Sequence, residues 1–340
     1  MNIEDIPLGN KNINSKRTFV IAEISGSHNG NKNKMKKLID IAYNSGADAV
    51  KIQKFKADDL VVKDYEYYED LKRLEIDNSF WSEVVSYAKN KSIPLLVDIF
   101  DSSDVYLLSD MGVDGFKIHT TDINNLDLIK DVADKNKPLF LSIGAANLND
   151  IENAISTVLE HHKNIILMYG FQSYPTPVEE SKLGYIPILK EIFNLNVGFL
   201  DHTPGGSIES MSVPLVSMAM GATVIEKHIT IDRKLKDPDY QSALNPDEFA
   251  QFIKLLRKVE DGIKFDGFEL SMKEEKYAEL VKRRIVSDRV IPAGKIIEKN
   301  DLNFKRAHTG LFINDLIKVI GRRAKIDLEK DVPITEEVFQ

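Results

Sequence analysis

The fold follows first from residues 18–53, which read TFVIAEISGSHNGNKNKMKKLIDIAYNSGADAVKIQ. A β-rich run at 18–24 precedes an amphipathic segment at 32–46, and a second β-rich run follows at 49–53. The apolar residues of the middle segment recur three and four positions apart, which predicts a helix with one face on a core. Because a helix between two strands typically joins parallel neighbours, this stretch predicts one strand–helix–strand unit.

The same alternation continues along the chain. Further β-rich runs lie at 94–100, 115–118, 138–143, 165–169, 197–200 and 223–228, with helical stretches between them. Eight such runs favour a closed (β/α)8 barrel, the TIM barrel, over an open doubly wound sheet. No GxGxxG follows the first run, so the dinucleotide-binding fold lacks its usual signature.

The pattern changes near the end of the chain. We expect a barrel domain over residues 1–264, a charged linker with a short helix at 265–280, and a small β-rich domain of short strands and turns at 281–340. The last segment has 13 Lys and Arg against 9 Asp and Glu, a net charge of +4, whereas residues 1–280 carry −12. The tail is therefore expected to dock electrostatically on an acidic body.

The composition limits the possible partners. The net charge of −8 argues against a nucleic-acid partner, and no apolar run reaches the roughly 18 residues that a membrane span needs. The N-terminal residues 1–16 are polar, without the apolar core of a secretory signal, so we expect a soluble, cytoplasmic protein. Because cysteine is absent, a metal ion must be bound by His, Asp, Glu or substrate oxygens.

Polar residues gather where the predicted strands end. In a barrel of this kind the active site lies at the carboxyl ends of the strands. The residues in question are Glu23, Lys51, Gln53, Lys117, Ser142, His202 and His228.

The stretch VIEKHIT at 224–230 shows how one strand serves two faces. Strand alternation directs Val224, Glu226 and His228 to one face and places Ile225 and Lys227 on the other. Two imidazoles at the same barrel mouth, His202 and His228, are able to ligate one divalent cation with substrate and water. The alternative is that Glu226 and His228 pair with each other or with a neighbouring strand.

Two lysines at the same mouth of an acidic protein indicate an anionic ligand. A buried cation needs an opposite charge, which a phosphate or carboxylate supplies. The alternative pairs Lys51 and Lys117 with Glu23, Asp98 and Glu226 as salt bridges inside the barrel. Spacing favours neither interpretation over the other.

A series of motifs gives this pattern a known counterpart. In order along the chain they are IAEISGSHNGN, GADAVKIQ, FKIHTTD, LSIGA, YPTP, DHT, GATVIEKHIT and DPDYQSALNPDEF. Together they resemble the N-acetylneuraminate (sialic acid) synthase family, which includes pseudaminic and legionaminic acid synthases. The tail, IVSDRVIPAGKIIEKNDLNFKRA onward, resembles the antifreeze-like (β-clip) domain of that family. The resemblance covers nearly the whole chain.

The resemblance implies an enzyme that condenses phosphoenolpyruvate with an N-acyl amino-sugar aldehyde to give a nine-carbon 2-keto acid and phosphate. It implies a divalent cation, Mn²⁺ before Mg²⁺ or Co²⁺, held by His202 and His228. It gives catalytic roles to Glu23, Lys51, Lys117 and His228, with Lys51, Lys117 and Ser142 gripping phosphoenolpyruvate and Glu23 binding sugar hydroxyls. It assigns further substrate contacts to Gln53, Asp98, Thr120, Gln172, Tyr174, Asp239 and Arg306. The acceptor sugar does not follow from it.

Several positions depart from the family pattern. Asp98 replaces a small hydroxyl residue, HTTD at 119–122 replaces GSGE with a large His119, and Leu200 replaces the serine before DHT. Gln172 takes an amide position, and Arg306 lies in KRAHTG rather than KRPG. An acid beside a phosphate pocket is repulsive unless it is paired, so we expect Asp98 to pair with a lysine or with His119. These changes leave open a catalytically altered family member that only binds its ligands, or a synthase with another aldehyde acceptor.

The resemblance and the charge division also imply a domain-swapped homodimer. Residues 281–340 of one subunit would cover the barrel mouth of the other, with Arg306 reaching the partner's site and reading the acyl-amino group. The alternative is that the tail packs on its own barrel as a stabilising module.

Overall fold

The computed structural model describes residues 5–265 and 267–340. Residues 1–4, in the predicted barrel domain, and residue 266, in the predicted linker, lie outside the described residues. The described part of the chain divides between Lys264 and Phe265 into two compact units.

The first unit is a closed barrel of parallel strands. Its strands follow one another around the barrel in chain order, and β10 pairs with both β9 and β3 to close it. Within the described residues the barrel strands are β3 (Phe19–Glu23), β4 (Ala49–Lys54), β5 (Leu95–Ile99), β6 (Gly115–Ile118), β7 (Leu139–Ser142), β8 (Ile165–Tyr169), β9 (Asn196–Asp201) and β10 (Val224–His228). The predicted (β/α)8 barrel is confirmed.

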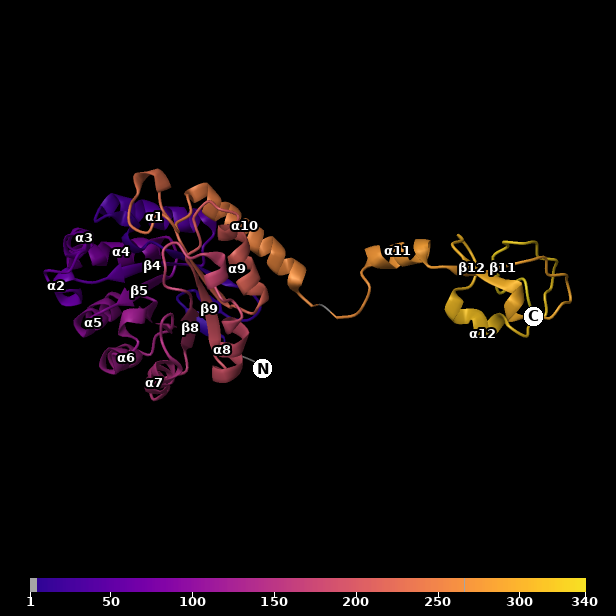
Figure 1. Cartoon of the computed structure of the whole chain (residues 1–340), viewed down its shortest axis with the longest axis horizontal. Helices are drawn as coiled ribbons and strands as arrows, with labels where there is room; N and C mark the ends of the chain where they lie inside the picture. Colours follow the sequence, from indigo (N-terminus) through magenta and orange to yellow (C-terminus); the bar gives the residue numbers. More distant parts are fainter. Residues whose placement is uncertain (1–4, 266) are drawn as a thin grey trace. The chain divides into compact units, whose positions relative to one another are not determined.

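Helices surround the strands (Figure 1). They are α1 (Lys32–Ser45), α2 (Ala57–Leu60), α3 (Tyr68–Leu74), α4 (Asn78–Asn90), α5 (Ser102–Met111), α6 (Leu126–Ala133), α7 (Leu148–Leu159), α8 (Tyr185–Phe193), α9 (Glu209–Ala219) and α10 (Pro246–Ile263). The first helix shows why such segments form. The Asn31 side chain caps its start, Gly46 ends it at φ 86°, and its face with Leu38 and Ile39 is buried in the layer between helices and strands.

The amino end of the barrel lumen is filled by apolar side chains and by an N-terminal hairpin. The hairpin strands β1 (Ile6–Leu8) and β2 (Lys11–Ile13) pair antiparallel, and Gly9 supplies a positive φ of 58° between them. Ile6, Leu8 and Ile13 pack with lumen residues of the barrel strands. The sequence analysis assigned no element to residues 1–16, because each strand is three residues long and too short for a clear alternation.

The second unit has a small core of its own. It contains α11 (Met272–Val281), the antiparallel strands β11 (Arg284–Ser287) and β12 (Leu302–Lys305), and α12 (Leu316–Val319). Its buried core comprises Ile285, Ile291, Ile297, Val319, Ala324, Leu328 and Ile334. The short strands and turns agree with the predicted β-rich tail, and α11 lies largely in the segment assigned as linker. Of the helices described, none combines the length and hydrophobicity that a bilayer-spanning segment requires.

Candidate active site

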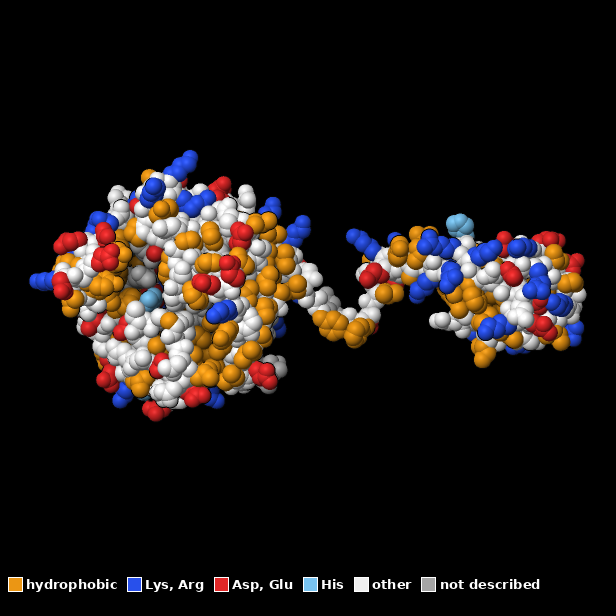
Figure 2. Space-filling model, in the orientation of Figure 1, with side chains coloured by type: hydrophobic (Ala, Val, Ile, Leu, Met, Phe, Trp, Pro, Cys, Tyr) orange, Lys and Arg blue, Asp and Glu red, His pale blue; other side chains and the backbone are white. Residues whose placement is uncertain are grey.

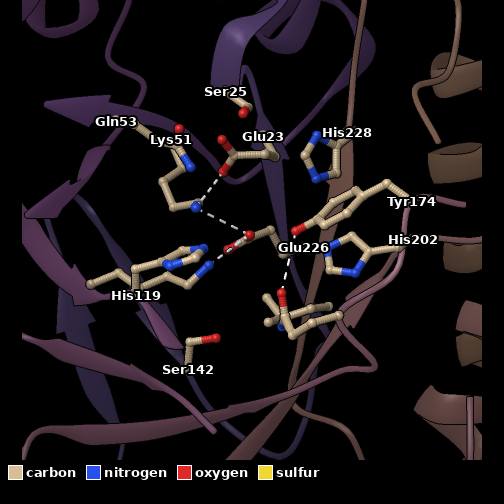
Figure 3. A pocket seen from close by; sticks show the side chains of 13 residues that line it. Glu23, Ser25, Lys51, Gln53, His119, Ser142, Tyr174, His202, Glu226 and His228 are labelled. Carbon is tan, nitrogen blue, oxygen red and sulfur yellow. Dashed lines mark hydrogen bonds and ion pairs between the residues drawn. The ribbon is translucent and has the colours of Figure 1, made fainter. Parts of the chain in front are cut away.

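A pocket lies at the carboxyl ends of the barrel strands. Figure 2 shows this face of the barrel hollowed, with acidic and histidine side chains visible there, and Figure 3 shows the side chains from close by. The lining residues are Glu23, Ser25, Lys51, Gln53, Lys117, His119, Ser142, Gln172, Tyr174, Leu200, His202, Glu226 and His228. All seven residues that the sequence analysis placed at strand ends are among them.

Lys51 lies at the centre of a buried group of charges. Its Nζ is 2.5 Å from Glu23 Oε2 and 3.2 Å from Glu226 Oε1, and it also pairs with Asp98. These side chains are at most 4% exposed. Burial disfavours the charged amine, but the carboxylates of Asp98, Glu226 and Glu23 outweigh that cost and hold the pKa of Lys51 well above its ordinary value.

The second lysine joins the same group. Lys117 Nζ lies 2.9 Å from Glu226 Oε1 and 4.0 Å from Asp98 Oδ1. The expectation that Asp98 pairs with a lysine is therefore confirmed. In this structure Lys51 and Lys117 form the salt bridges of the alternative interpretation. These salt bridges do not exclude ligand binding, because both amines also face the pocket.

The pKa values of the two glutamates in this group are shifted in opposite directions. Burial raises the pKa of Glu23 to about 8, since the attraction of the Lys51 ammonium does not compensate for the lost hydration of the carboxylate. Burial acts on Glu226 in the same direction, but Lys117 and Lys51 together lower its pKa to about 2. Burial thus favours the neutral form of Glu23, whereas the two lysines favour the ionised form of Glu226.

His202 and His228 face each other across one side of the pocket, with ring centroids 5.4 Å apart. Burial lowers the pKa of both, that of His228 to about 3, so both rings are neutral at pH 7. His202 Nδ1 lies 2.9 Å from the Phe171 carbonyl oxygen, whereas His228 Nδ1 is buried without a hydrogen-bond partner among the described residues. Tyr174 covers the pair, at a ring distance of 4.3 Å from His202.

These two rings fit a divalent cation as a partial ligand set. Neutral imidazole nitrogens are ordinary metal ligands. In the described residues no group of three His, Asp or Glu side chains is arranged to hold a metal ion. A cation here would therefore complete its coordination with substrate or water oxygens, as the sequence analysis expected.

The outer face of the same strands supports the two histidines. Lys227 Nζ lies 2.5 Å from Asp201 Oδ2, and Thr203 donates its hydroxyl to Asp201 Oδ1 at 2.7 Å. Lys227 and Asp201 are opposite each other in the register of β10 and β9, directly before His228 and His202. The interpretation that Glu226 and His228 face inward and Lys227 outward is thus confirmed.

Other predicted contacts lie beside the pocket rather than in its lining. Thr120 Oγ1 donates to the Gly144 carbonyl oxygen at 2.6 Å, and Asp239 accepts a hydrogen bond of 2.6 Å from Ser25 Oγ. Asp98 lies behind Lys51. Arg306 belongs to the second unit, so its predicted role at a partner's site stays a prediction.

The sequence analysis did not place Ser25 in the pocket, and it named His119 only as a departure from the family pattern and a candidate partner of Asp98. Both lie just past the end of a barrel strand, Ser25 two residues after β3 and His119 one residue after β6. That position was a usable signal. Ser25 adopts a left-handed backbone with φ 42°, which aims its side chain toward Asp239 and is not readable from residue type.

The fold and the pocket define a (β/α)8-barrel enzyme with its site at the carboxyl ends of the strands. The chain belongs to the NeuB family, whose model matches residues 38–265, and an SAF domain, the antifreeze-like module, matches residues 282–339. Both agree with the resemblance found in the sequence.

Relatives and solved structures support the same assignment. The chain is 34% identical to N,N'-diacetyllegionaminic acid synthase of Campylobacter jejuni, over 94% of this chain and 100% of that protein. It is 35% identical to an uncharacterised protein of Methanocaldococcus jannaschii, over 97% of each chain. A crystal structure of N-acetylneuraminic acid (sialic acid) synthetase from Leptospira borgpetersenii in complex with citrate aligns with a TM-score of 0.76 at 28% identity, covering 82% of this chain and 96% of that one.

Proposed function

We propose that this chain is a nonulosonic acid synthase, which condenses phosphoenolpyruvate with an N-acyl amino-sugar aldehyde to give a nine-carbon 2-keto acid and phosphate. The observation that carries the proposal is the pocket in which Lys51 and Lys117 lie with the neutral pair His202 and His228. The names of the relatives support it, since they include synthases of legionaminic and pseudaminic acid.

Phosphoenolpyruvate would bind to the lysines. Both amines are buried and held in place by carboxylates, so little reorganisation is needed when substrate oxygens join or replace Glu226 and Asp98 as partners. Ser142 lines the same side and would add a hydroxyl contact. Gln53, Gln172 and Glu23 line the remaining wall, where the sugar hydroxyls would lie.

His202 and His228 would hold the divalent cation, Mn²⁺ before Mg²⁺ or Co²⁺. When bound, the cation supplies a Lewis acid for the sugar aldehyde. Tyr174 packs on His202 and lies edge-on to His228, so it orders both rings and excludes water from them.

The bonds and charges of the reaction balance with water as the co-reactant. The enol carbon C3 of phosphoenolpyruvate attacks the aldehyde carbon, and the aldehyde oxygen takes a proton. Water adds at C2, and the resulting tetrahedral carbon expels inorganic phosphate as the keto group forms. Lys51 and Lys117 would stabilise the negative charge of the departing phosphate.

The test is phosphate release from phosphoenolpyruvate with Mn²⁺ and a panel of aldehyde-form amino sugars. We expect release with at least one N-acyl amino sugar and none without a sugar. Phosphoenolpyruvate binding without phosphate release for any sugar would favour a catalytically altered binding protein. The pairing of Asp98 with Lys51 would then be the change that explains the lost turnover.

We also propose the domain-swapped homodimer, with Arg306 completing the site of the partner. Its support is the charge division of the sequence and the separate core of residues 265–340. Mixing inactive Lys117→Ala subunits with inactive Arg306→Ala subunits should restore one working site per heterodimer. No recovery after confirmed subunit exchange would indicate that each tail serves its own barrel.

A further inference from the structure

We propose that His119 binds an anionic oxygen of phosphoenolpyruvate through its Nε2–H. The inference rests on the proposed function and adds a substrate-binding residue that the family resemblance does not assign. It follows from three features of the loop after β6: a hydroxyl that is already engaged, an imidazole whose Nδ1 accepts a backbone hydrogen bond, and a ring that is held against the pocket wall.

The hydroxyl of this loop is not free to bind substrate. Thr120 Oγ1 lies 2.6 Å from the Gly144 carbonyl oxygen and 3.2 Å from the Ser142 carbonyl oxygen, both of which are acceptors. A hydroxyl has one proton to donate, and the Thr120 proton is directed at these carbonyl oxygens rather than at a substrate. Thr120 is also absent from the pocket lining, which instead contains its neighbour His119.

The Nδ1 atom of His119 faces Thr121. The Thr121 backbone N–H, which is able only to donate, lies 3.4 Å from Nδ1, and Thr121 Oγ1 lies 3.2 Å from Nδ1 in a contact whose direction depends on the tautomer. We take Nδ1 as the acceptor of the backbone N–H, and a neutral imidazole in that role carries its proton on Nε2. No residue in the ranges 5–265 and 267–340 hydrogen-bonds this Nε2 in the structure.

The ring is oriented by aromatic packing. His119 lies 5.6 Å from the Phe100 ring, which in turn meets Phe55 edge-on at 6.1 Å. Figure 3 shows the His119 side chain on the opposite side of the pocket from His202 and His228. Burial keeps the ring neutral, with its pKa lowered to about 4. It therefore offers a neutral donor close to Lys117 without adding to the charge that Asp98 and Glu226 must balance.

Two matched variants test this role by calorimetric titration with phosphoenolpyruvate. His119→Phe keeps the aromatic packing on Phe100 but lacks the donor, and His119→Gln keeps an N–H near the position of Nε2. Because a hydrogen bond to a charged group is lost, the Kd of His119→Phe should rise about 10- to 100-fold, whereas His119→Gln should stay within about threefold of the unchanged protein. Thermal unfolding of both variants checks that they are folded. Mn²⁺ affinity should not change in either.

Titration with inorganic phosphate identifies the contacted group. A parallel loss of phosphate affinity in His119→Phe places the contact at the phosphate, and a loss for phosphoenolpyruvate alone places it at the carboxylate. A folded His119→Phe protein that binds phosphoenolpyruvate within about twofold of the unchanged protein overturns this inference and leaves the proposed function intact. If the unchanged protein does not bind phosphoenolpyruvate, the proposed function fails and the inference with it.

Discussion

The two ends of the barrel lumen are built by the same strands and differ completely in chemistry. On β10 the lumen side reads Val224, then Glu226 and His228, and on β4 it reads Ala49, then Lys51. At the amino end the apolar members pack with the N-terminal hairpin, whereas at the carboxyl end the polar members form the pocket. A step of two residues along a strand thus separates a stabilising core from a reactive site.

The difference shows where stability and function reside. Apolar burial at the amino end contributes roughly 1.5–3 kcal/mol for a fully buried aliphatic side chain. Buried ion pairs at the carboxyl end are often no better than neutral compared with apolar packing. The buried lysines Lys51 and Lys117 are therefore explained by a ligand rather than by stability. Substitutions at the two ends should separate these roles.

The largest effect is expected for Lys51→Met. It leaves Glu23, Asp98 and Glu226 without a shared cation, which should reduce the free energy of unfolding by about 3–5 kcal/mol. Phosphoenolpyruvate binding should weaken by about 2–5 kcal/mol. Urea unfolding and calorimetry measure the two effects, and a variant with unchanged stability and affinity would remove the ligand-based explanation of this end.

At the opposite end, Leu8→Ala should affect stability alone. Leu8 is fully buried in the amino-end core, so its truncation should cost about 2–5 kcal/mol of unfolding free energy. Phosphoenolpyruvate affinity measured on the folded fraction should not change. Leu159→Ala, at a half-exposed position of α7, is the matched control and should stay within about 0.5 kcal/mol. Loss of ligand binding in Leu8→Ala would mean that the two ends are coupled.

Acid should also act through the carboxyl end. Burial lowers the pKa of His28, in the turn after β3, from 6.5 to about 4. Below pH 6.5 the unfolded chain therefore binds a proton that the folded one does not, and stability falls as the pH is lowered through this window. The loss between pH 7.5 and 5 should be about 2 kcal/mol from this group. Urea unfolding at both pH values measures it, and His28→Gln should reduce the loss by about 2 kcal/mol, the share of this group. An equally steep dependence in that variant would assign the effect to other groups.

The smallest effect is expected for Asp98→Ser, which removes one negative charge from the carboxyl end. Lys51 keeps Glu23 and Glu226 as partners, so the protein should fold. Phosphoenolpyruvate affinity, measured by calorimetry, should be equal or higher because one repulsive carboxylate is gone. If the variant lost all turnover, Asp98 would have a catalytic role that charge pairing does not explain.

The sequence by itself determined the barrel, the strand positions and the faces of the strands. These follow from local periodicity, since a strand alternates every residue and a helix repeats every 3.6. It also placed Glu23, Lys51, Lys117, His202 and His228 in one pocket, because parallel strands bring their carboxyl ends together. The strands of the N-terminal hairpin are too short to show the alternation of a strand, so the sequence of residues 1–16 indicates only a polar segment.

Only the tertiary structure decided which side chains meet. Lys51 binds Asp98 as well as Glu23, and Lys227 pairs with Asp201. These contacts depend on strand register and on the distances between side chains of neighbouring strands. His119 rather than Thr120 lines the pocket, and the Thr120 hydroxyl lies against the carbonyl oxygens of Gly144 and Ser142. Such contacts join residues far apart in the chain or turn on a few tenths of an ångström. A linear pattern of residue types predicts the face of a strand on which a side chain lies, but it does not predict which residue that side chain contacts.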